Sequence, residues 1–351
     1  PMNWRTALAS LSISARSWAR YQGAIRAIQW LGGYSSLPLH LDLVLTWRCN
    51  LACPMCNLRQ EEHVRAFAPF RGRELTPADW CHLLDDVKRS FPLRPNINLL
   101  GGEPTLYAGY LEVAAYAKQA GFRCTFVTNG TTLARDAERL VAIGIDVITV
   151  SLDGDEALHD HIRGAGVYRR AVEGIRRVQE ARRASGLHRP RLFMATAISG
   201  ANYTQLSALV EMAHALGLEA LTFLHLQFPD TDLATHGIEV PRLLEEMALA
   251  EERARALGLP THFYPHLKRE QVPTYYLEPA DHLGKHCLSP WLRMSILPEG
   301  TVVACENHVI GQWREGTLRA IWNGPRMRAF RKRLAQKGTM PSCGRCCRRL
   351  F

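Results

Sequence analysis

Thr46-Trp47-Arg48-Cys49-Asn50-Leu51-Ala52-Cys53-Pro54-Met55-Cys56-Asn57 is a run that holds three cysteines in the spacing C-x3-C-x2-C. No histidine or fourth cysteine in the run completes a tetrahedron, and structural zinc sites use four protein ligands. Three thiolates can instead hold a [4Fe–4S] cluster whose fourth iron stays open to another molecule. The spacing therefore predicts such a cluster, and a loop of structural or zinc-binding cysteines remains the alternative.

The residues just before the cysteines set the fold around them. Leu39-His40-Leu41-Asp42-Leu43-Val44-Leu45-Thr46 alternates in the way of a strand that enters a sheet. The cysteines therefore follow the carboxyl end of a strand. This is the end at which α/β barrels place their catalytic groups.

The size and composition of the chain bound its class. With 351 residues, one large barrel plus a smaller domain is the natural expectation. An apolar share of 47% with 22% charged residues is typical of a globular protein. We recognise no signal peptide and no apolar run long enough to span a bilayer. We therefore expect a cytoplasmic protein, in which close-set cysteines indicate metal or redox sites rather than disulfides.

The formal charge of +10 comes more from arginine than from lysine, and many of the basic residues lie in the last thirty-odd positions. A solvated basic surface explains this charge, and a phosphorylated or otherwise anionic substrate is the alternative. We find no nucleic-acid-binding module, so no specific nucleic acid is expected as a partner.

Apolar strands alternate with helical stretches after residue 39. The predicted strands are 39–47, 96–101, 123–128, 146–152, 191–198 and 220–226. The predicted helices between them are 77–91, 108–120, 134–143, 168–185 and 203–216, and another follows at 241–257. Six βα units at this spacing predict a parallel sheet with right-handed crossovers. The expected fold class is α/β, a partial (β/α)6 TIM-like barrel that is laterally open.

Four regions are expected along the chain. Residues 1–38 form an N-terminal helical extension, 39–240 the barrel, 241–286 a helix and connector, and 287–351 a small cysteine-rich domain. The helix predicted over 3–33 either caps the bottom of the barrel or, as a basic amphipathic segment with Trp4, Trp18 and Trp30, rests on a membrane surface.

A second motif, Gly101-Gly102-Glu103-Pro104, directly follows the predicted strand 96–101. Paired glycines let the backbone approach a ligand closely, and the glutamate can accept hydrogen bonds from an ammonium group. Taken alone, the four residues also fit a plain tight turn.

Polar residues follow the next strand ends as well. They are Thr128, Asn129, Ser151, Asp153, Arg163, Thr196 and Asn202. Serine and aspartate side chains can bind hydroxyl groups, and an arginine can hold a carboxylate through two parallel bonds. Each residue alone could be a turn or helix cap, but as an ordered set at strand ends they indicate a binding site.

The second cysteine group is C-terminal, with Cys287, Cys305 and the run Cys343-Gly344-Arg345-Cys346-Cys347. Four thiolates from these segments would fully ligate a second iron–sulfur cluster. Zinc remains a competitor because four thiolates also suit that metal.

With these motifs in place, the chain resembles the radical S-adenosylmethionine (SAM) superfamily over roughly residues 39–351. There the free iron of the three-cysteine cluster binds the amino and carboxylate groups of SAM, and the Gly-Gly-Glu-Pro segment binds its amino group. The resemblance assigns the cluster to Cys49, Cys53 and Cys56. It assigns SAM contacts to Met55, Gly101, Gly102, Glu103, Pro104, Thr128, Asn129, Ser151, Asp153, Arg163, Thr196 and Asn202. At Met55 the family often has an aromatic residue near the adenine.

The C-terminal cysteines resemble the shortened, single-cluster "twitch" form of the SPASM domain. The resemblance makes Cys287, Cys305, Cys343 and Cys346 the ligands of one auxiliary iron–sulfur cluster, expected to be [4Fe–4S]. The chain ends too soon to supply the further cysteines of the longer form. Cys347 is left over: it could replace Cys346 as ligand, be idle, or donate a hydrogen atom to a substrate radical as a thiol does in some epimerases.

The resemblance implies that a reduced flavoprotein or ferredoxin supplies an electron, after which SAM is cleaved to a 5′-deoxyadenosyl radical. That radical abstracts hydrogen from an unactivated carbon. With the auxiliary cluster as electron acceptor, we expect an oxidoreductase that performs a two-electron oxidation of a small polar or anionic substrate. The alternatives are a peptide maturase that forms cross-links, an epimerase that uses Cys347, and a non-catalytic zinc- or nucleic-acid-binding protein. Fold alone does not name the substrate.

Overall fold

The structure is a computed structural model that describes residues 33–56, 58, 68, 72–226, 236–278, 287–305, 308–337 and 346. The helix predicted over 3–33 lies outside these ranges, except for Gly33, and the membrane contact expected of it therefore stays untested. Cys343 and Cys347 also lie outside the described residues.

One ten-stranded sheet organises the chain, in the order β10-β9-β8-β1-β2-β3-β4-β5-β6-β7. The strands are β1 (His40–Val44), β2 (Asn96–Leu100), β3 (Cys124–Thr128), β4 (Val147–Ser151), β5 (Arg191–Ile198), β6 (Leu221–His225), β7 (Thr261–Tyr264), β8 (Arg293–Ile296), β9 (Thr301–Val303) and β10 (Val309–Gln312). All pairs from β8 through β1 to β7 are parallel, whereas β8, β9 and β10 pair antiparallel. This arrangement confirms the expected α/β partial barrel.

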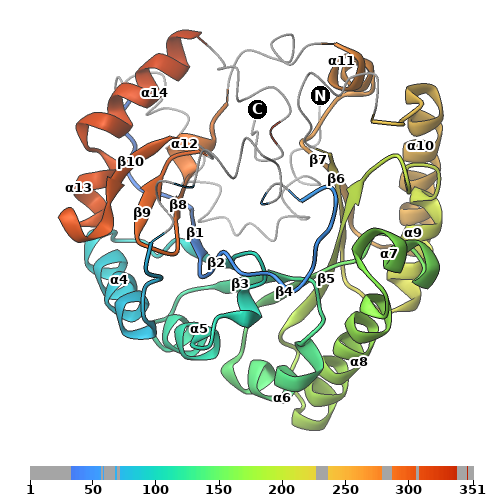
Figure 1. Cartoon of the computed structure of the whole chain (residues 1–351), viewed down its shortest axis with the longest axis horizontal. Helices are drawn as coiled ribbons and strands as arrows, with labels where there is room; N and C mark the ends of the chain where they lie inside the picture. The colour runs from blue at the N-terminus through green and yellow to red at the C-terminus, as the bar shows by residue number, and fades with distance from the viewer. Residues whose placement is uncertain are drawn as a thin grey trace.

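The helices surround the curved sheet on its outer side (Figure 1). The α-helices are α4 (Pro77–Ser90), α5 (Tyr110–Gln119), α6 (Leu133–Ile143), α7 (Glu156–Arg163), α8 (Val167–Ser185), α9 (Leu206–Ala215), α10 (Val240–Leu257), α11 (Val272–Leu277), α12 (Ser289–Leu292), α13 (Leu318–Trp322) and α14 (Pro325–Lys337). Short 3-10 helices are η3 (Pro104–Leu106), η5 (Arg269–Gln271) and η7 (Trp313–Glu315). None of these described helices is both long and apolar enough to cross a bilayer.

Local sequence signals set several element boundaries. Helix α4 begins at a capping box in which the Thr76 hydroxyl accepts from the Asp79 amide while the Asp79 carboxylate accepts from the Thr76 amide. Helix α6 ends at Gly144, whose φ of 75° is the left-handed conformation that favours glycine at a helix C-terminus. Such signals explain why the predicted segments agree with the observed ones to within a few residues.

The two faces of β1 show how the sheet divides the chain. Leu41 and Leu43 are fully buried against the helix layer, where they belong to the main hydrophobic core. Asp42 and Val44 alternate with them and face the barrel interior, because successive side chains of a strand point to opposite faces. The inner face is therefore the one on which a site can form.

The sheet is larger than six strands because two parallel strands extend it. Strand β7 lies in the predicted region of helix and connector, 241–286, and it pairs with β6 through Leu221↔Thr261. Its four residues, Thr-His-Phe-Tyr, are too short and too polar to show a strand pattern. Strand β8 comes from the C-terminal region and pairs with β1, so this region continues the barrel sheet.

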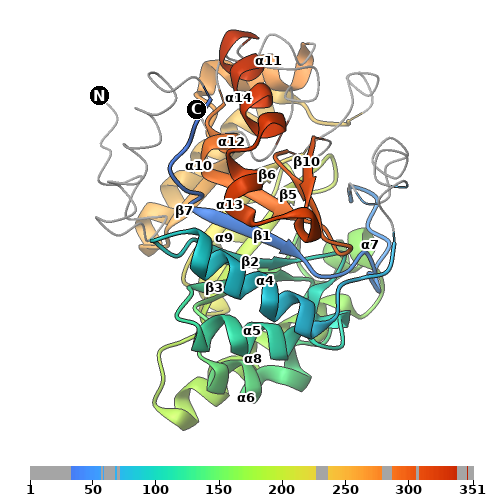
Figure 2. The same ribbon diagram turned by 90° about the vertical axis from the view of Figure 1, so that its left-hand side faces the viewer.

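The C-terminal elements pack beside α4 and β1, as the two views agree (Figures 1 and 2). The Asp86 carboxylate of α4 accepts a hydrogen bond of 2.8 Å from the amide of Leu318 at the start of α13. Arg314 donates to Asp79 at 2.7 Å. These contacts join the second half of the chain to the first βα unit, next to the cysteine run.

Candidate active site

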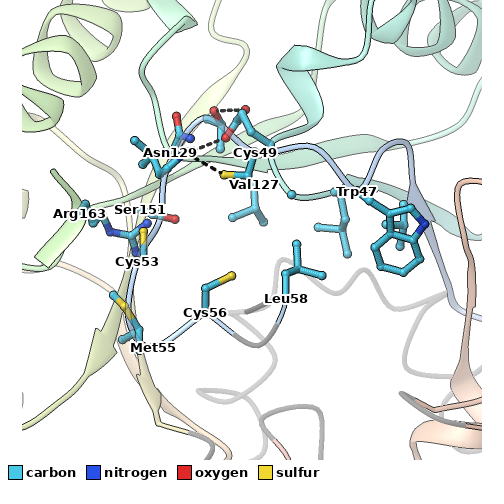
Figure 3. A pocket seen from close by; sticks show the side chains of 18 of the residues that line it. Trp47, Cys49, Cys53, Met55, Cys56, Leu58, Val127, Asn129, Ser151 and Arg163 are labelled. Carbon is cyan, nitrogen blue, oxygen red and sulfur yellow. Dashed lines mark hydrogen bonds between the residues drawn. The ribbon is translucent and has the colours of Figure 1, made fainter. Parts of the chain in front are cut away.

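A cavity of about 400 Å³ lies at the carboxyl ends of the parallel strands. This volume falls within the usual size of small-molecule sites. Its walls come from the cysteine loop, the ends of β1 to β5 and the β8–β9 hairpin, and Figure 3 shows many of the side chains that line it.

The three cysteines of the loop all line this cavity. Cys49 is exposed, Cys53 buried and Cys56 half-buried, and the Cys56 amide donates to the Cys53 carbonyl at 3.1 Å, which closes the turn between them. Burial raises the pKa of both Cys49 and Cys53, and the guanidinium of Arg163 opposes this rise at Cys53.

The donor set fits an iron–sulfur cluster. Three thiols face one cavity, and a cube binds each of its thiolates through a different iron atom. Within the described ranges, no three His, Cys, Asp or Glu side chains are arranged to hold a single metal ion. Structural zinc sites use four protein ligands, so a loop that supplies three thiols fits a multi-iron group.

Hydrogen bonds anchor the cysteine loop to the end of β3. The side-chain amide of Asn129 donates from Nδ2 to Asn50 Oδ1 at 2.9 Å, and the side-chain amide of Asn50 donates from Nδ2 to Thr131 Oγ1 at 2.9 Å. On the other side, the Glu74 carboxylate accepts from the Thr46 hydroxyl at 2.6 Å and from the Trp47 amide at 3.3 Å. The loop is thus held at both flanks of the cysteines.

Gly101 and Gly102 line the cavity and also let the Gly-Gly-Glu segment pack against the cysteine loop. The Gly102 amide donates to the Thr46 carbonyl at 2.9 Å, and the Glu103 amide donates to the Arg48 carbonyl at 2.8 Å. A Cβ atom at Gly102 would lie 2.4 Å from the Arg48 carbonyl oxygen. The glycines are therefore required because two backbone segments pack against each other here. The sequence had indicated only that the glycines let the backbone approach a ligand.

Glu103 is almost fully buried beneath the cavity, at 1% exposure. Its Oε1 accepts from the hydroxyls of Thr105 and Thr128, each at 2.7 Å, and its Oε2 accepts from the backbone amide of Asn129 at 2.7 Å. Burial raises its pKa, while these hydrogen bonds act in the opposite direction. The carboxylate thereby fixes the end of β3, where Thr128 and Asn129 line the cavity.

Ser151 and Arg163 form another side of the cavity, and Met55 lies near them in Figure 3. The Arg163 Nε donates to Asp153 Oδ2, and Asp153 Oδ1 accepts from the Ala197 amide at 2.9 Å. The buried Asp153 thus orients a cationic side chain toward the cavity. Its negative charge raises the pKa of Arg163, against the lowering effect of burial.

Four predicted SAM contacts lie behind the cavity wall rather than on it: Pro104, Asp153, Thr196 and Asn202. The Thr196 hydroxyl donates to the Leu152 carbonyl at 2.6 Å. The side-chain amide of Asn202 donates from Nδ2 to the backbone carbonyls of Asp153 and Ala197 at 3.0 and 2.9 Å. The buried Asp153, Thr196 and Asn202 hold the ends of β4 and β5 together, and the expected contact of these residues and Pro104 with SAM stays a prediction.

Several cavity residues were not predicted from the sequence. They are Val44, Trp47, Leu51, Leu58, Leu100, Val127, Ala197, Ser295, Leu297 and Val303. The alternation of β1 and β3 could have indicated Val44 and Val127, since each is the last inward position of its strand. No local signal places Ser295, Leu297 and Val303 there, because only the pairing of β8 with β1 brings them to the cavity.

The described C-terminal cysteines, Cys287, Cys305 and Cys346, are not among the residues that line this cavity. Cys287 precedes α12, Cys305 follows β9, and Cys346 follows α14. All three are half-buried, and each takes part in interactions. The predicted four-cysteine set includes Cys343, which lies outside the described residues, so its assembly stays a prediction.

Two protein families match the chain. The radical SAM superfamily matches residues 43–213, and the SPASM iron–sulfur cluster-binding domain matches residues 287–347. Together these matches cover both of the cysteine groups that the sequence analysis singled out.

Curated relatives of the chain are named for different activities. The Fe-coproporphyrin III synthase of Methanosarcina barkeri is 29% identical over 282 residues, which is 80% of this chain and 64% of that protein. The chain thus spans slightly less than two thirds of this relative's length. The PqqA peptide cyclase of Ruegeria pomeroyi is 29% identical over 324 residues, which is 88% of this chain and 80% of that protein.

Solved structures share the fold. SuiB of Streptococcus suis bound to S-adenosylmethionine superposes with a TM-score of 0.66 at 16% identity, covering 90% of this chain and 70% of SuiB. Native anSMEcpe with bound AdoMet gives a TM-score of 0.61 at 12% identity, covering 84% of this chain and 82% of that chain. At this identity the likeness concerns the fold.

Proposed function

The chain belongs to the radical SAM superfamily and carries a C-terminal SPASM domain, and we propose that the substrate on which this enzyme acts is a peptide. The observation that carries the proposal is the similarity to PqqA peptide cyclases, which extends over 88% of the chain for one of them and so includes both matched domains. The finer reaction is a net oxidation or cross-link at a peptide carbon.

Different residues around the cavity would bind the cluster and SAM. Cys49, Cys53 and Cys56 would hold a [4Fe–4S] cluster, and SAM would lie between this loop, Glu103 and Arg163. When bound, the reduced cluster and SAM supply a radical that removes a hydrogen atom from an unactivated carbon. Arg163, oriented by Asp153, offers a cation for the SAM carboxylate, and Ser151 offers a hydroxyl for the ribose.

The C-terminal domain has a proposed role in electron transfer. Cys287, Cys305, Cys343 and Cys346 would hold one auxiliary cluster, which would serve as the electron acceptor for oxidation of the substrate. A flavoprotein or ferredoxin is the proposed reductant of the first cluster. Cys347 is then not needed as a hydrogen donor, because an oxidation ends with loss of hydrogen from the substrate.

An anionic tetrapyrrole is the second candidate substrate, because the Fe-coproporphyrin III synthase relative is also 29% identical. The described part of the cavity favours the peptide. Arg163 is the cation among the described lining residues, and the side formed by Val44, Trp47, Leu297 and Val303 is apolar. This wall suits an amino-acid side chain better than a ring of carboxylates.

The radical SAM activity is tested by anaerobic reconstitution with iron and sulfide, followed by SAM and dithionite. We expect iron–sulfur absorption and formation of 5′-deoxyadenosine in the wild type, and loss of both the first cluster's EPR signal and the product in Cys56→Ala. Cys81→Ala is the matched control, since Cys81 lies on α4 away from the cavity. Wild-type protein that binds only zinc and forms no 5′-deoxyadenosine contradicts the assignment.

The substrate class is tested with two sets of probes. Peptides encoded by short reading frames beside the gene are compared with iron coproporphyrin III, and products are analysed by mass spectrometry in deuterated buffer. We expect a peptide to lose hydrogen without taking up deuterium from the solvent. Uptake of one deuterium would instead indicate epimerisation, and turnover of the tetrapyrrole alone would overturn the peptide proposal.

A further inference from the structure

Helix α7 carries a buried histidine that has no part in the proposed function. His159 lies on this helix and is fully buried. It precedes Arg163 by four residues, so the two side chains lie on the same face of the helix, one turn apart. Arg163 lines the cavity, on the same side as Cys53 in Figure 3, whereas His159 is not among the lining residues. His159 is therefore placed to act on a cavity residue from behind.

His159 and Arg163 both bind Asp153, at two different groups of that residue. The Asp153 backbone amide donates to His159 Nδ1 at 3.1 Å, and Arg163 Nε donates to Asp153 Oδ2. Asp153 follows the last residue of β4 by two positions. Helix α7 thus contacts this strand end through a backbone hydrogen bond and a side-chain ion pair, one turn apart on the helix.

The other polar groups of Asp153 are bonded to the segment at the end of β5. Asp153 Oδ1 accepts from the Ala197 amide at 2.9 Å, and the Asp153 carbonyl accepts from Asn202 Nδ2 at 3.0 Å. These bonds fix Asp153 relative to the sheet. The bond to His159 then sets the position of α7 against this fixed residue, and with it the point from which the Arg163 side chain extends.

The His159 ring is a hydrogen-bond acceptor in this contact. Because Nδ1 accepts from a backbone N–H, the neutral ring carries its proton on Nε2. Burial lowers the pKa of His159 to about 4, and the positive charge of Arg163 acts in the same direction, while the charges of Asp153 and Asp160 oppose it. The ring is therefore uncharged near neutral pH, and Nδ1 stays available to the Asp153 amide.

Packing by itself does not account for a histidine at this position. Its Nε2 is buried and has no hydrogen-bond partner within the described part of the chain. A buried N–H without a partner is unfavourable, and a phenylalanine would avoid it. The edge-to-face contact with the Tyr168 ring, with centroids 5.9 Å apart, is one that a phenyl ring can also make. What the histidine supplies and a phenylalanine does not is the acceptor at Nδ1.

We propose that His159 is a positioning residue for SAM binding, which holds α7 against the backbone of Asp153 so that Arg163 reaches the SAM carboxylate. This inference rests on the proposed contact between Arg163 and SAM, and it adds a residue that does not touch the ligand. Because His159 acts through a cation that binds a carboxylate, its effect should depend on the carboxylate of the ligand. A general loss of stability would have no such dependence.

The test measures binding of SAM and of decarboxylated SAM to the reconstituted full-length chain by anaerobic equilibrium dialysis. In His159→Phe we expect SAM to bind about three- to tenfold more weakly, the effect of one net hydrogen bond. Decarboxylated SAM should lose much less affinity. His161→Phe, at an exposed position of the same helix, is the matched control and should bind both ligands like the wild type.

His159→Asn separates the acceptor from the packing of the ring. An asparagine Oδ1 can accept from the Asp153 amide in place of Nδ1, but the smaller side chain fills less of the buried space. We therefore expect His159→Asn to bind SAM more tightly than His159→Phe, although urea unfolding should show it to be no more stable. SAM affinity that follows stability across the two variants would indicate a structural role and overturn the proposal.

Arg163→Gln distinguishes this inference from the proposed function. This variant should weaken SAM more than decarboxylated SAM. The double variant His159→Phe/Arg163→Gln should bind SAM no more weakly than Arg163→Gln alone, because residues that act through one contact are not additive. Additive losses, or equal losses of both ligands in His159→Phe, overturn the positioning role.

The two possible failures give different results. If Arg163→Gln weakens both ligands equally, the proposed contact of Arg163 with the SAM carboxylate is wrong, and the role of His159 falls with it. If Arg163→Gln shows the dependence on the carboxylate and His159→Phe does not, the contact stands and the role of His159 is wrong.

Discussion

The Cα atom of Gly102 faces the Arg48 carbonyl so closely that an added Cβ would lie 2.4 Å from its oxygen. The same segment donates two backbone hydrogen bonds to the cysteine loop, from Gly102 to Thr46 and from Glu103 to Arg48. The cysteine run and the Gly-Gly-Glu motif, fifty residues apart in the sequence, are therefore one packed unit.

We predict that Gly102→Ala displaces the cysteine loop, because the carbonyl that the new methyl meets belongs to the backbone and cannot rotate away. Overpacking of this kind costs about 1–3 kcal/mol. The measurements are urea unfolding and the iron content after reconstitution, both of which should fall. Gly316→Ala is the control, since a Cβ there meets nothing within 4 Å. Equal iron content in the two variants would contradict the prediction.

We predict that Asp153→Asn weakens SAM binding about tenfold by releasing Arg163. Both Asp153 oxygens accept hydrogen bonds, and an asparagine oxygen can replace only one of them. Loss of a charge-assisted bond of about 1.5 kcal/mol corresponds to that factor. Anaerobic equilibrium dialysis of SAM measures the effect.

Asp160→Asn is the matched control for this experiment. The Asp160 carboxylate also accepts two hydrogen bonds, from the amides of Gly166 and Tyr168, but it does not line the cavity or contact Arg163. SAM affinity should therefore stay unchanged. If both variants lose affinity equally, the effect comes from general destabilisation and the positioning role of Asp153 is wrong.

We predict that His225 makes the fold less stable in mild acid. His225 is buried between β6 and α11, where its Nδ1 lies 2.8 Å from the Tyr276 hydroxyl, and burial lowers its pKa from 6.5 to about 3. The unfolded chain takes up a proton below the unfolded pKa of 6.5, whereas the folded chain does not until about 3. Stability from this group is thus lost as the pH falls through that window, by about 1.4 kcal/mol per pH unit.

The measurement compares urea unfolding of wild type and His225→Gln between about pH 6.5 and about pH 5. The glutamine can still bond to Tyr276 but does not titrate, so the variant should lose less stability on acidification. His188→Gln, at an exposed position, should follow the wild type. Parallel pH dependences of wild type and His225→Gln would exclude His225 as the source.

We predict that Arg331→Lys destabilises the C-terminal region by about 1–3 kcal/mol, the cost of unsatisfied buried polar groups. The fully buried Arg331 donates to the carbonyls of Pro290 and Gly33 at 2.9 and 3.2 Å, and its guanidinium lies 4.1 Å from the centre of the Trp322 ring. A single ammonium group cannot reproduce that geometry. Thermal unfolding measures the loss, and the exposed Arg328→Lys on the same helix should show almost none.

The periodic elements of the fold were predictable because their signals are local. All six predicted strands are present, and helix ends coincide with caps such as Thr76 and Gly144. Strand β7 was missed because four residues carry too little periodicity against a background of proline and histidine. Its pairing with β6 is a tertiary interaction that the pattern of β7 alone does not indicate.

The site was predictable as a set of strand ends, whereas the lining of the cavity depends on which face of its strand each residue takes. Thr196 and Ala197 are neighbours on β5, yet Ala197 lines the cavity and Thr196 is buried behind it. Adjacent strand residues point to opposite faces, so a motif that is displaced by one residue changes from ligand contact to support. A choice of site residues by polarity alone points to Thr196, whereas the direction of the side chain brings Ala197 to the cavity.

The sequence by itself determined the chemistry at which the reaction begins. The C-x3-C-x2-C spacing limits the donor set to three thiols, and the Gly-Gly-Glu-Pro motif one βα unit later identifies the second element of the same site. Only the tertiary structure decided what faces this chemistry. Parallel pairing of β8 with β1 brings Ser295 and Leu297 beside Trp47 from more than two hundred residues away, because strand partners are chosen by the packing of the whole sheet and not by local sequence.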